Sequence, residues 1–429
     1  MLIDKLILKL RLSLPIVLVS ALLLSTDACT SRTITPGLKP LFEVVAAANS
    51  SNQWKSEAMI VCDGKADQVE INRYLSLGYP VFLAPGDYYC NDNIIPPGTT
   101  RLYGEGNDSV IHLNGGGINI ADVSNIEIDH LKLVGRVDKN NLNAAVFIGS
   151  EISNINDIKI HDISCDTTGT DHFDVFTASK RISNLVFSNV ASNNPDGFGF
   201  ILMGDGPNSV IDHVTFYKCT VVNAGVAPTR TSDWITGFDF AELAASEYLE
   251  VNDMYAIGCM VNGAWESSFH MEAKPAKNDF VILDCDARNA GLKPFPEYGY
   301  GYLVSGDTIF YSNTAISNKN GDLNLYDTIY TPIVNGISPP NSGKTVTVIN
   351  QSNCSGIIIN EDITHKKLVL YSNDGQPVDQ QIELGYYYKA DDGMVYSFRD
   401  TKIIARFRDY AIISLVKNIP LTAGSNLTP

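Results

Sequence analysis

The phrase that decides the fold recurs along the chain as HFDVF (172–176), GFGFI (197–201), GFDFA (237–241), SFHME (268–272) and GYGYL (299–303). Successive side chains of a β-strand point to opposite faces. If each phrase is a strand on one coil of a solenoid, its aromatic residue faces the core and the next residue faces outward. We align the aromatic residues Phe173, Phe198, Phe238, Phe269 and Tyr300. The outward column predicted by this alignment contains Asp174, Gly199, Asp239, His270 and Gly301.

Short alternating apolar segments give a second repeat. They end at Cys165, Ala191, Cys219, Cys259 and Cys285, at intervals of 26, 28, 40 and 26 residues. Repeats of about 20 to 50 residues indicate stacked structural units. Because short β segments and turns lie between these positions, without a helical period, we predict an all-β solenoid.

The cysteines of this repeat are predicted to be buried. Cys165, Cys219, Cys259 and Cys285 fall at one repeat position, which favours stacked free thiols that act as small apolar residues. Adjacent coils about 4.8 Å apart would also allow a disulfide between two of them, Cys259 and Cys285. Cys62 and Cys90 are the better candidates for a disulfide in an exported chain.

The N-terminus has the pattern of a secretory signal. Lys5, Lys9 and Arg11 precede an apolar run over 12–24, which is too short to span a bilayer. We therefore predict a signal over 1–28 and a secreted or cell-surface protein without a membrane span. Cleavage before Cys29 would leave a lipid-anchored cysteine, although Asp27 departs from the usual lipoprotein signal and ordinary cleavage nearby is the alternative.

Composition excludes some classes of partner. The chain has 429 residues, 45% of them hydrophobic and 18% charged, so it can bury a large core. Its formal net charge of −17 argues against binding nucleic acid or an anionic membrane surface, both of which need basic patches. An acidic glycan remains compatible, because basic residues such as Arg230 and Lys274 cluster near the phrase.

The pattern along the chain predicts a signal, a spacer over 29–57, a β-helix domain over 58–350 and a C-terminal tail over 351–429. Asp67 can cap a helix whose apolar stripe is Val69, Ile71 and Leu75, and such a helix would close the end of the solenoid. VTVINQSNCSGIIIN (346–360) could form a last coil. The tail reads as antiparallel β structure, or a small cap domain.

The segments VFLAPGDYY (81–89), IIPPGTTRLYGEG (94–106) and SVIHL (109–113), which follow this helix, carry a family resemblance. They resemble the N-terminal cap and first coils of the pectate-lyase-like right-handed parallel β-helix superfamily, and the resemblance covers roughly 58–350. It implies a right-handed parallel β-helix. That superfamily includes polysaccharide lyases, polygalacturonase-type hydrolases, uronan epimerases, phage tailspikes and proteins without known catalysis, so the fold leaves the activity open.

The outward column is a candidate active site. Stacking places Asp239 and His270 about 5 Å apart and Asp174 two coils, about 10 Å, from Asp239. Gly199 between the two aspartates would leave a notch for a sugar ring. Two carboxylates at this separation suit inverting glycoside hydrolysis. Elimination or epimerisation would instead use a base such as His270 and a cation such as Arg230 or Lys274.

A second column contains Asp171, Asp196, Thr236 and Ser267. This column faces the groove only if the chain bends there. Asp171 and Asp196 would then be neighbours on adjacent coils, and two carboxylates so close would form either a proton donor or a calcium site. SNNPDGFGF (192–200) partly resembles the Asn-x-Asp-Gly segment of polygalacturonase-type hydrolases. SFHME is loosely similar to an epimerase motif but lacks its leading Asp-Pro. The chemistry requires no cofactor other than this possible calcium, and no residue is assigned as a metal ligand.

We therefore predict an exported polysaccharide-active enzyme, either hydrolase or lyase or epimerase, with catalytic residues Asp174, Asp196, Asp239 and His270. Trp234 and Trp265 could stack on sugar faces or simply pack inside the solenoid. The predicted substrate-binding residues are Asp171, Arg230, Trp234, Glu242, Trp265, Glu266, Glu272 and Lys274. The alternatives are a turn ladder without chemistry, and a non-catalytic glycan-binding or adhesin-like surface protein. The export signal argues against a tailspike.

Overall fold

In the computed structural model, residues 42–326 are described except for 137–142, 226–233, 241–248, 272–279, 295, 297, 306–307 and 312. Beyond residue 326 the description is confined to strands between 346 and 415. The predicted secretory signal and Cys29 thus lie outside the described residues. In the described part of the chain, no helix combines the length and apolar character needed to cross a membrane.

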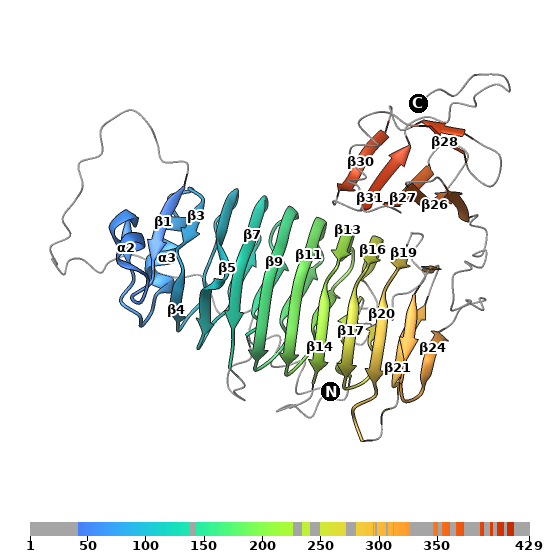
Figure 1. The fold of residues 1–429 in the computed structure, drawn as a ribbon, viewed down its shortest axis with the longest axis horizontal. Coiled ribbons are helices and arrows are strands. Elements are labelled where there is room, and N and C mark those ends of the chain that lie inside the picture. The colour runs from blue at the N-terminus through green and yellow to red at the C-terminus, as the bar shows by residue number, and fades with distance from the viewer. Residues whose placement is uncertain are drawn as a thin grey trace.

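The larger of two parallel sheets forms one wall of a solenoid (Figure 1). Its neighbouring strands are, in spatial order, β2 (Ile60–Val61), β1 (Glu43–Ala46), β3 (Val81–Leu83), β5 (Thr100–Leu113), β7 (Ile126–Val134), β9 (Ile155–Thr168), β11 (Arg181–Pro195), β13 (Val210–Tyr217), β16 (Glu250–Ile257), β19 (Phe280–Leu283) and β22 (Thr308–Tyr311). Strands that pair alongside this path are β4 (Gly86–Cys90), β14 (Thr220–Ala224), β17 (Met260–Ala264), β20 (Asp286–Ala290) and β23 (Thr314–Ile316).

The second parallel sheet contains the aromatic phrases. Its order is β24 (Gly321–Tyr326), β21 (Tyr300–Ser305), β18 (Phe269–His270), β15 (Phe238–Asp239), β12 (Phe200–Asp205), β10 (Phe173–Ala178), β8 (Val146–Ser150) and β6 (Ile118–Ala121). The chain alternates between the two sheets and pairs in parallel in both. The predicted right-handed parallel β-helix is confirmed.

Columns of left-handed residues turn each coil. Positive φ is uncommon outside glycine, and Asn and Asp tolerate it best. The register of the strands stacks such residues on successive coils. One column contains Asn125, Asp157, Asn184, His213 and Asp253; a second contains His130, Asp162, Asn189, Lys218, Gly258 and Asp284; a third contains Thr167, Asn194, Asn223, Gly263, Asn289 and Ser317.

The aromatic residues of the phrase stack in the core, but not in the predicted register. Strand pairing joins Phe173, Phe200, Phe238, Phe269 and Tyr302, whose neighbouring rings stack at centroid distances of 4.7–5.0 Å. The prediction placed Phe198 and Tyr300 in this column and was wrong on these two coils, where Phe200 and Tyr302, two residues later, occupy it. A shift of two residues keeps the same faces, because the pleat has a period of two.

The cysteine ladder is shorter than predicted. Cys219, Cys259 and Cys285 do stack on successive coils. They follow the ends of the paired strands β13, β16 and β19, and all three are free and buried. Cys165 instead pairs with Ser192, and Val190 rather than Ala191 aligns with the cysteine column. The predicted candidates for a disulfide, Cys62 and Cys90, are also free buried thiols.

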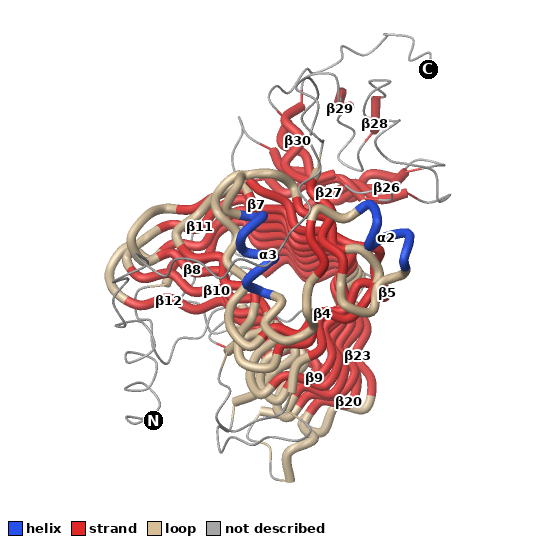
Figure 2. Tube along the Cα trace, turned by 90° about the vertical axis from the view of Figure 1, so that its left-hand side faces the viewer, coloured by secondary structure: helices blue, strands red, loops and turns tan. Residues whose placement is uncertain are grey.

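The N-terminal end of the solenoid is closed by a cap, and its helix α3 (Gln68–Leu75) lies across the coils in the view along the axis (Figure 2). Ile71 and Leu75 are buried, whereas Val69 is 60% exposed and does not belong to the apolar stripe. Asp67 stands at the N-cap, but its carboxylate accepts from the backbone N–H groups of Gly64 and Tyr89 instead of the helix.

The cap begins earlier in the chain than the sequence indicated. Strand β1 pairs with β3, and helix α2 (Asn52–Glu57) follows it, so part of the predicted spacer over 29–57 is folded. At the other end, β24 is the last parallel strand among the described residues, and the strand at 346–350 belongs to an antiparallel sheet and is no coil of the solenoid. Its apolar alternation could not reveal whether its partner would be parallel or antiparallel.

The tail forms the predicted antiparallel structure. Strands β25 (Val346–Asn350), β26 (Cys354–Asn360), β27 (Lys366–Ser372), β31 (Tyr410–Leu415) and β30 (Thr401–Arg406) make a five-stranded sheet. Strands β28 (Tyr387–Lys389) and β29 (Val395–Ser397) form a separate antiparallel pair.

Candidate active site

The outward column of the second sheet brings the predicted catalytic residues together. Asp174 of β10 pairs with Ile201 of β12, Ile201 pairs with Asp239 of β15, and Asp239 pairs with His270 of β18. The order of Asp174, Asp239 and His270 is therefore as predicted, with Asp174 two coils from Asp239. The alternative of a turn ladder is wrong for these three residues, because they lie within strands and the left-handed turn columns lie elsewhere.

The predicted notch is absent. Ile201 rather than Gly199 separates the two aspartates, and Leu303 rather than Gly301 follows His270. Gly199 lies against the opposite wall of the coil, where a Cβ atom would approach Val221 Cγ2 to 2.6 Å. The two-residue shift that moved Phe200 into the core also moved this glycine out of the column.

Asp239 and His270 form a buried pair of ionisable side chains. His270 Nδ1 lies 3.3 Å from Asp239 Oδ2, and the two residues are 3% and 0% exposed. Asp174 is buried as well, at 6% exposed. Their side chains lie on the face of the strand opposite the stacked rings. A carboxylate beside an imidazole orients the ring and stabilises its protonated form, which is the arrangement of a general base.

The second predicted column is also displaced. Backbone hydrogen bonds place Phe198, not Asp196, between Asp171 and Thr236. Asp171 accepts a hydrogen bond from the Phe198 backbone N–H at 2.9 Å, so its carboxylate fixes the neighbouring coil. Asp196 is 1% exposed and lies further back along the chain, beside Pro195. The predicted Asp171–Asp196 pair on equivalent positions is therefore wrong, and a calcium ion there stays a prediction.

Glu266 stabilises a loop at the edge of the column. Its Oε1 atom lies 3.3 Å from Lys293 Nζ, and its Oε2 atom accepts a hydrogen bond from the Tyr298 backbone N–H at 2.8 Å. The Tyr298 ring lies 5.3 Å from the ring of Trp234, which is 39% exposed. Trp265 is only partly buried and packs against the core. Trp234 is thus partly on the surface, and its stacking on a sugar stays a prediction, whereas Glu266 has mainly internal partners.

Other predicted residues lie outside the described part of the chain: Arg230, Glu242, Glu272 and Lys274. The sequence reasoning missed two contributors to this region. His172 is buried and its Nδ1 contacts Ser192 Oγ at 2.7 Å, and Tyr298 supplies the ring beside Trp234. His172 begins the phrase HFDVF and Tyr298 precedes GYGYL. Their positions beside the aligned phrases could have identified both as candidate site residues.

Comparisons with known proteins find no matching family model and no matching curated relative. Among solved structures, the chain is similar to the A-module of mannuronan C-5 epimerase AlgE6 from Azotobacter vinelandii, at 15% identity over 60% of this chain and 85% of that one, with a TM-score of 0.34. It is similar to an alginate lyase from Paenibacillus, at 11% identity over 60% and 97%, with a TM-score of 0.35.

A third similar structure is tailspike protein 2 of the Escherichia coli O157:H7 bacteriophage CAB120, at 12% identity over 84% of this chain and 68% of that one, with a TM-score of 0.38. Identities this low carry no activity from one protein to another. The stacked parallel sheets by themselves show that this chain has a parallel β-helix fold.

Proposed function

We propose that this chain is an exported enzyme that acts on a uronic-acid polysaccharide by moving a ring proton, in elimination or epimerisation. The Asp239–His270 pair supports the proposal. An ionisable pair buried on the outer side of a strand contributes little to core packing, and titratable pairs of this kind concentrate at functional sites. In this assignment His270 takes the proton and Asp239 holds the ring in its orientation.

Hydrolysis by Asp174 and Asp239 is the second candidate. Both carboxylates lie in one column two coils apart, which is close to the separation that inverting hydrolysis requires. The side chain of Ile201 between them occupies the position where the sequence had predicted space for a sugar. This favours the proton-transfer assignment over hydrolysis. A calcium requirement and lipidation at Cys29 stay predictions.

The activity is tested by incubating the purified chain with uronic-acid polymers and with neutral polysaccharides. Elimination creates a ring double bond that absorbs in the ultraviolet. Epimerisation in heavy water introduces deuterium at the inverted carbon without chain cleavage. New reducing ends without either signal would indicate hydrolysis, and binding without any product would favour the adhesin-like alternative.

The assignment of the base is tested with His270→Gln, for which we expect a loss of at least about 10²-fold in kcat on the polymer that proves active. Asp239→Asn should lower kcat by a similar factor, because the ring loses its orienting carboxylate. The matched control is His112→Gln, since His112 also pairs with an aspartate, Asp87, at 2.8 Å but in the other sheet. Activity of His270→Gln within about threefold of the parent chain would contradict the assignment.

A further inference from the structure

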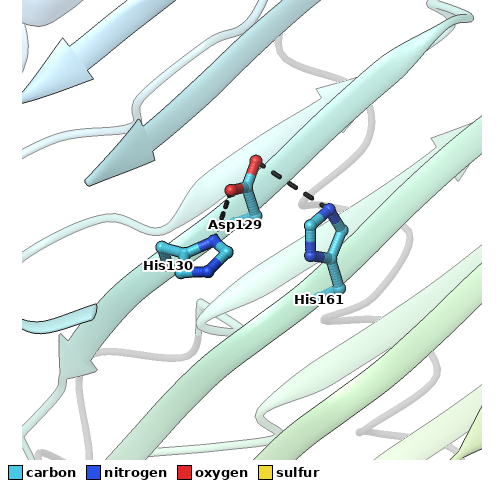
Figure 3. Close-up of side chains that lie close together, drawn as sticks. All are labelled: Asp129, His130 and His161. Carbon is cyan, nitrogen blue, oxygen red and sulfur yellow. Dashed lines mark hydrogen bonds and ion pairs between the residues drawn. The ribbon is translucent and has the colours of Figure 1, made fainter. Parts of the chain in front are cut away.

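A second group of ionisable residues lies on the larger sheet, away from the candidate active site. Asp129 of β7 stands directly beside His161 of β9 in the strand register, and His130 follows Asp129 in the chain. Figure 3 shows the two imidazole rings on either side of the Asp129 carboxylate. Asp129 is fully buried, whereas the side chains of His130 and His161 are 50% and 22% exposed, so solvent reaches the group.

The spacing of the donor atoms is close to that of a metal site. Asp129 Oδ1 lies 2.6 Å from His130 Nδ1, and Asp129 Oδ2 lies 3.9 Å from His161 Nε2. One donor atom from each of the three residues falls within 4.8 Å of the others. Tetrahedral zinc with bonds of about 2.1 Å separates its ligand atoms by about 3.4 Å. Each pair of donor atoms lies within about 1.5 Å of that separation, so modest side-chain shifts would bring the three ligands to one ion.

The hydrogen bond of His161 leaves the appropriate nitrogen for a ligand. His161 Nδ1 lies 2.8 Å from Asp162 Oδ2, and because an ionised carboxylate only accepts, Nδ1 carries the proton. Nε2 then faces Glu127 Oε1 at 3.2 Å and Asp129 Oδ2 at 3.9 Å. Nε2 therefore lies on the side of the ring that faces Asp129 and Glu127, where an ion bound to Asp129 would meet it. Metal-bound histidines commonly donate their other N–H to a carboxylate in this way.

The surrounding charges suit a divalent ion. Arg101 donates from Nε and Nη2 to the two oxygens of Asp129, at 2.7 and 2.8 Å, which holds that carboxylate in place. Glu127, Asp129 and Asp162 supply three negative charges against the single positive charge of Arg101. Two imidazoles in the ligand set favour a transition metal over calcium or magnesium, which prefer oxygen ligands.

We propose that Asp129, His130 and His161 bind one divalent transition-metal ion, such as zinc, with Glu127 or a water molecule in the fourth position. Binding releases the ring protons of the ligating nitrogens to solvent, so the metal competes with protons. The ion joins β7 to β9 and thereby stabilises two neighbouring coils. This inference is independent of the proposed activity on glycans.

The test uses the full chain without a histidine tag, freed of metal with a chelator. Calorimetric titration with Zn²⁺ should show one ion bound per chain, and Co²⁺ should produce the visible absorption of a four-coordinate site. We expect His130→Gln and His161→Gln each to weaken Zn²⁺ binding by at least about 10-fold. Far-ultraviolet circular dichroism of each variant shows whether the β-helix is intact.

The chain offers a matched control in His213. Its ring nitrogens lie 3.3 Å from Asp212 and 3.3 Å from Asp253, and Arg181 pairs with Asp212, but the group has a single histidine. His213→Gln should therefore keep the affinity of the parent chain for Zn²⁺. Absence of saturable Zn²⁺ and Co²⁺ binding, or an equal loss in His213→Gln, would overturn the proposal.

Discussion

His172 is the residue before Phe173 in the first phrase, and its ring lies wholly inside the solenoid. Ser192 Oγ contacts Nδ1 at 2.7 Å, and Nε2 has no hydrogen-bond partner among the described residues. Burial lowers the pKa of His172 from its ordinary value of 6.5 to about 3, and the nearby Asp166 offsets this only in part. The ring is therefore neutral in the folded chain at ordinary pH.

This burial predicts a pH-dependent stability. In the unfolded chain His172 takes up a proton below about pH 6.5, whereas the folded chain does so only below about pH 3. Within that window the folded state loses up to about 1.4 kcal/mol per pH unit as the pH falls. Urea unfolding between pH 7 and 4 should show a shallower decline in His172→Gln than in the parent chain. The control Ile152→Ala, at a side chain that is 74% exposed and has no ionisable group, should keep the parent slope; equal slopes for all three proteins would contradict the prediction.

Gly199 shows why the column did not have the predicted notch. A Cβ atom at this position would meet Gly237 O and Val221 Cγ2, both at 2.6 Å. We expect Gly199→Ala to destabilise the chain by roughly 1–3 kcal/mol, because the backbone of the next coil cannot easily move away. The control is Gly98→Ala, whose nearest neighbour would be Ser124 O at 3.5 Å. Thermal unfolding compares the two, and a neutral Gly199→Ala would show that the coils are not packed this closely.

At the scale of the strand, the ring stack fixes which residues of adjacent coils are neighbours. Phe200 stacks between Phe173 and Phe238 at 4.7 Å on each side and also packs on Phe187 and Phe216. Offset and edge-to-face ring contacts add to the burial of apolar surface. The phrases GFGFI and GYGYL each have two aromatic residues two positions apart, on one face of the strand, so the sequence pattern alone does not choose between Phe198 and Phe200.

The stack predicts a large effect for a central ring. Phe200→Ala should lower the free energy of unfolding by about 3–5 kcal/mol, through lost burial and an internal cavity. Ile152→Ala, at a side chain that is 74% exposed, should change it by less than about 0.5 kcal/mol. Denaturant unfolding followed by circular dichroism compares them. If Phe198→Ala proved more damaging than Phe200→Ala, the register would be the one first predicted from the sequence.

At the scale of the whole molecule, a solenoid exposes a hydrophobic core and an unpaired strand edge at each end. Here β1, β2 and α3 cover the first coil, and Val45, Ile71 and Leu75 are fully buried in that cap. The formal net charge of −17 opposes association of intact chains. The cap therefore opposes association at the N-terminal end of the solenoid, where apolar area and open backbone coincide.

Opening the cap should cause association. Leu75→Ser places a hydroxyl among apolar side chains and leaves a cavity, which should loosen α3 from the first coil. Light scattering after size exclusion should then show oligomers. Val69→Ser, on the exposed face of the same helix, should remain like the parent chain. Oligomers in both variants, or in neither, would contradict a capping role for the buried face.

The sequence by itself determined the class of fold. The repeat interval, the alternation of strands and the turn residues indicated a β-solenoid, and the family resemblance of the segments between 81 and 113 implied a right-handed parallel β-helix. The order Asp174, Asp239, His270 in one outward column followed from the aligned phrases. A helix at the N-terminal end and an antiparallel tail were also predicted. These features depend on local patterns with a period of two residues or of one coil, which the chain itself displays.

Only the tertiary structure decided the register between coils and the burial of the site. A shift of two residues preserves which side chains face inward, so Ile201 could replace Gly199, and Ser192 could align with Cys165, without any change in the pattern. Close packing between coils selected one register. That packing brings Asp239 and His270 together with their side chains almost fully buried. It also places Asp129 beside His161 on the other sheet.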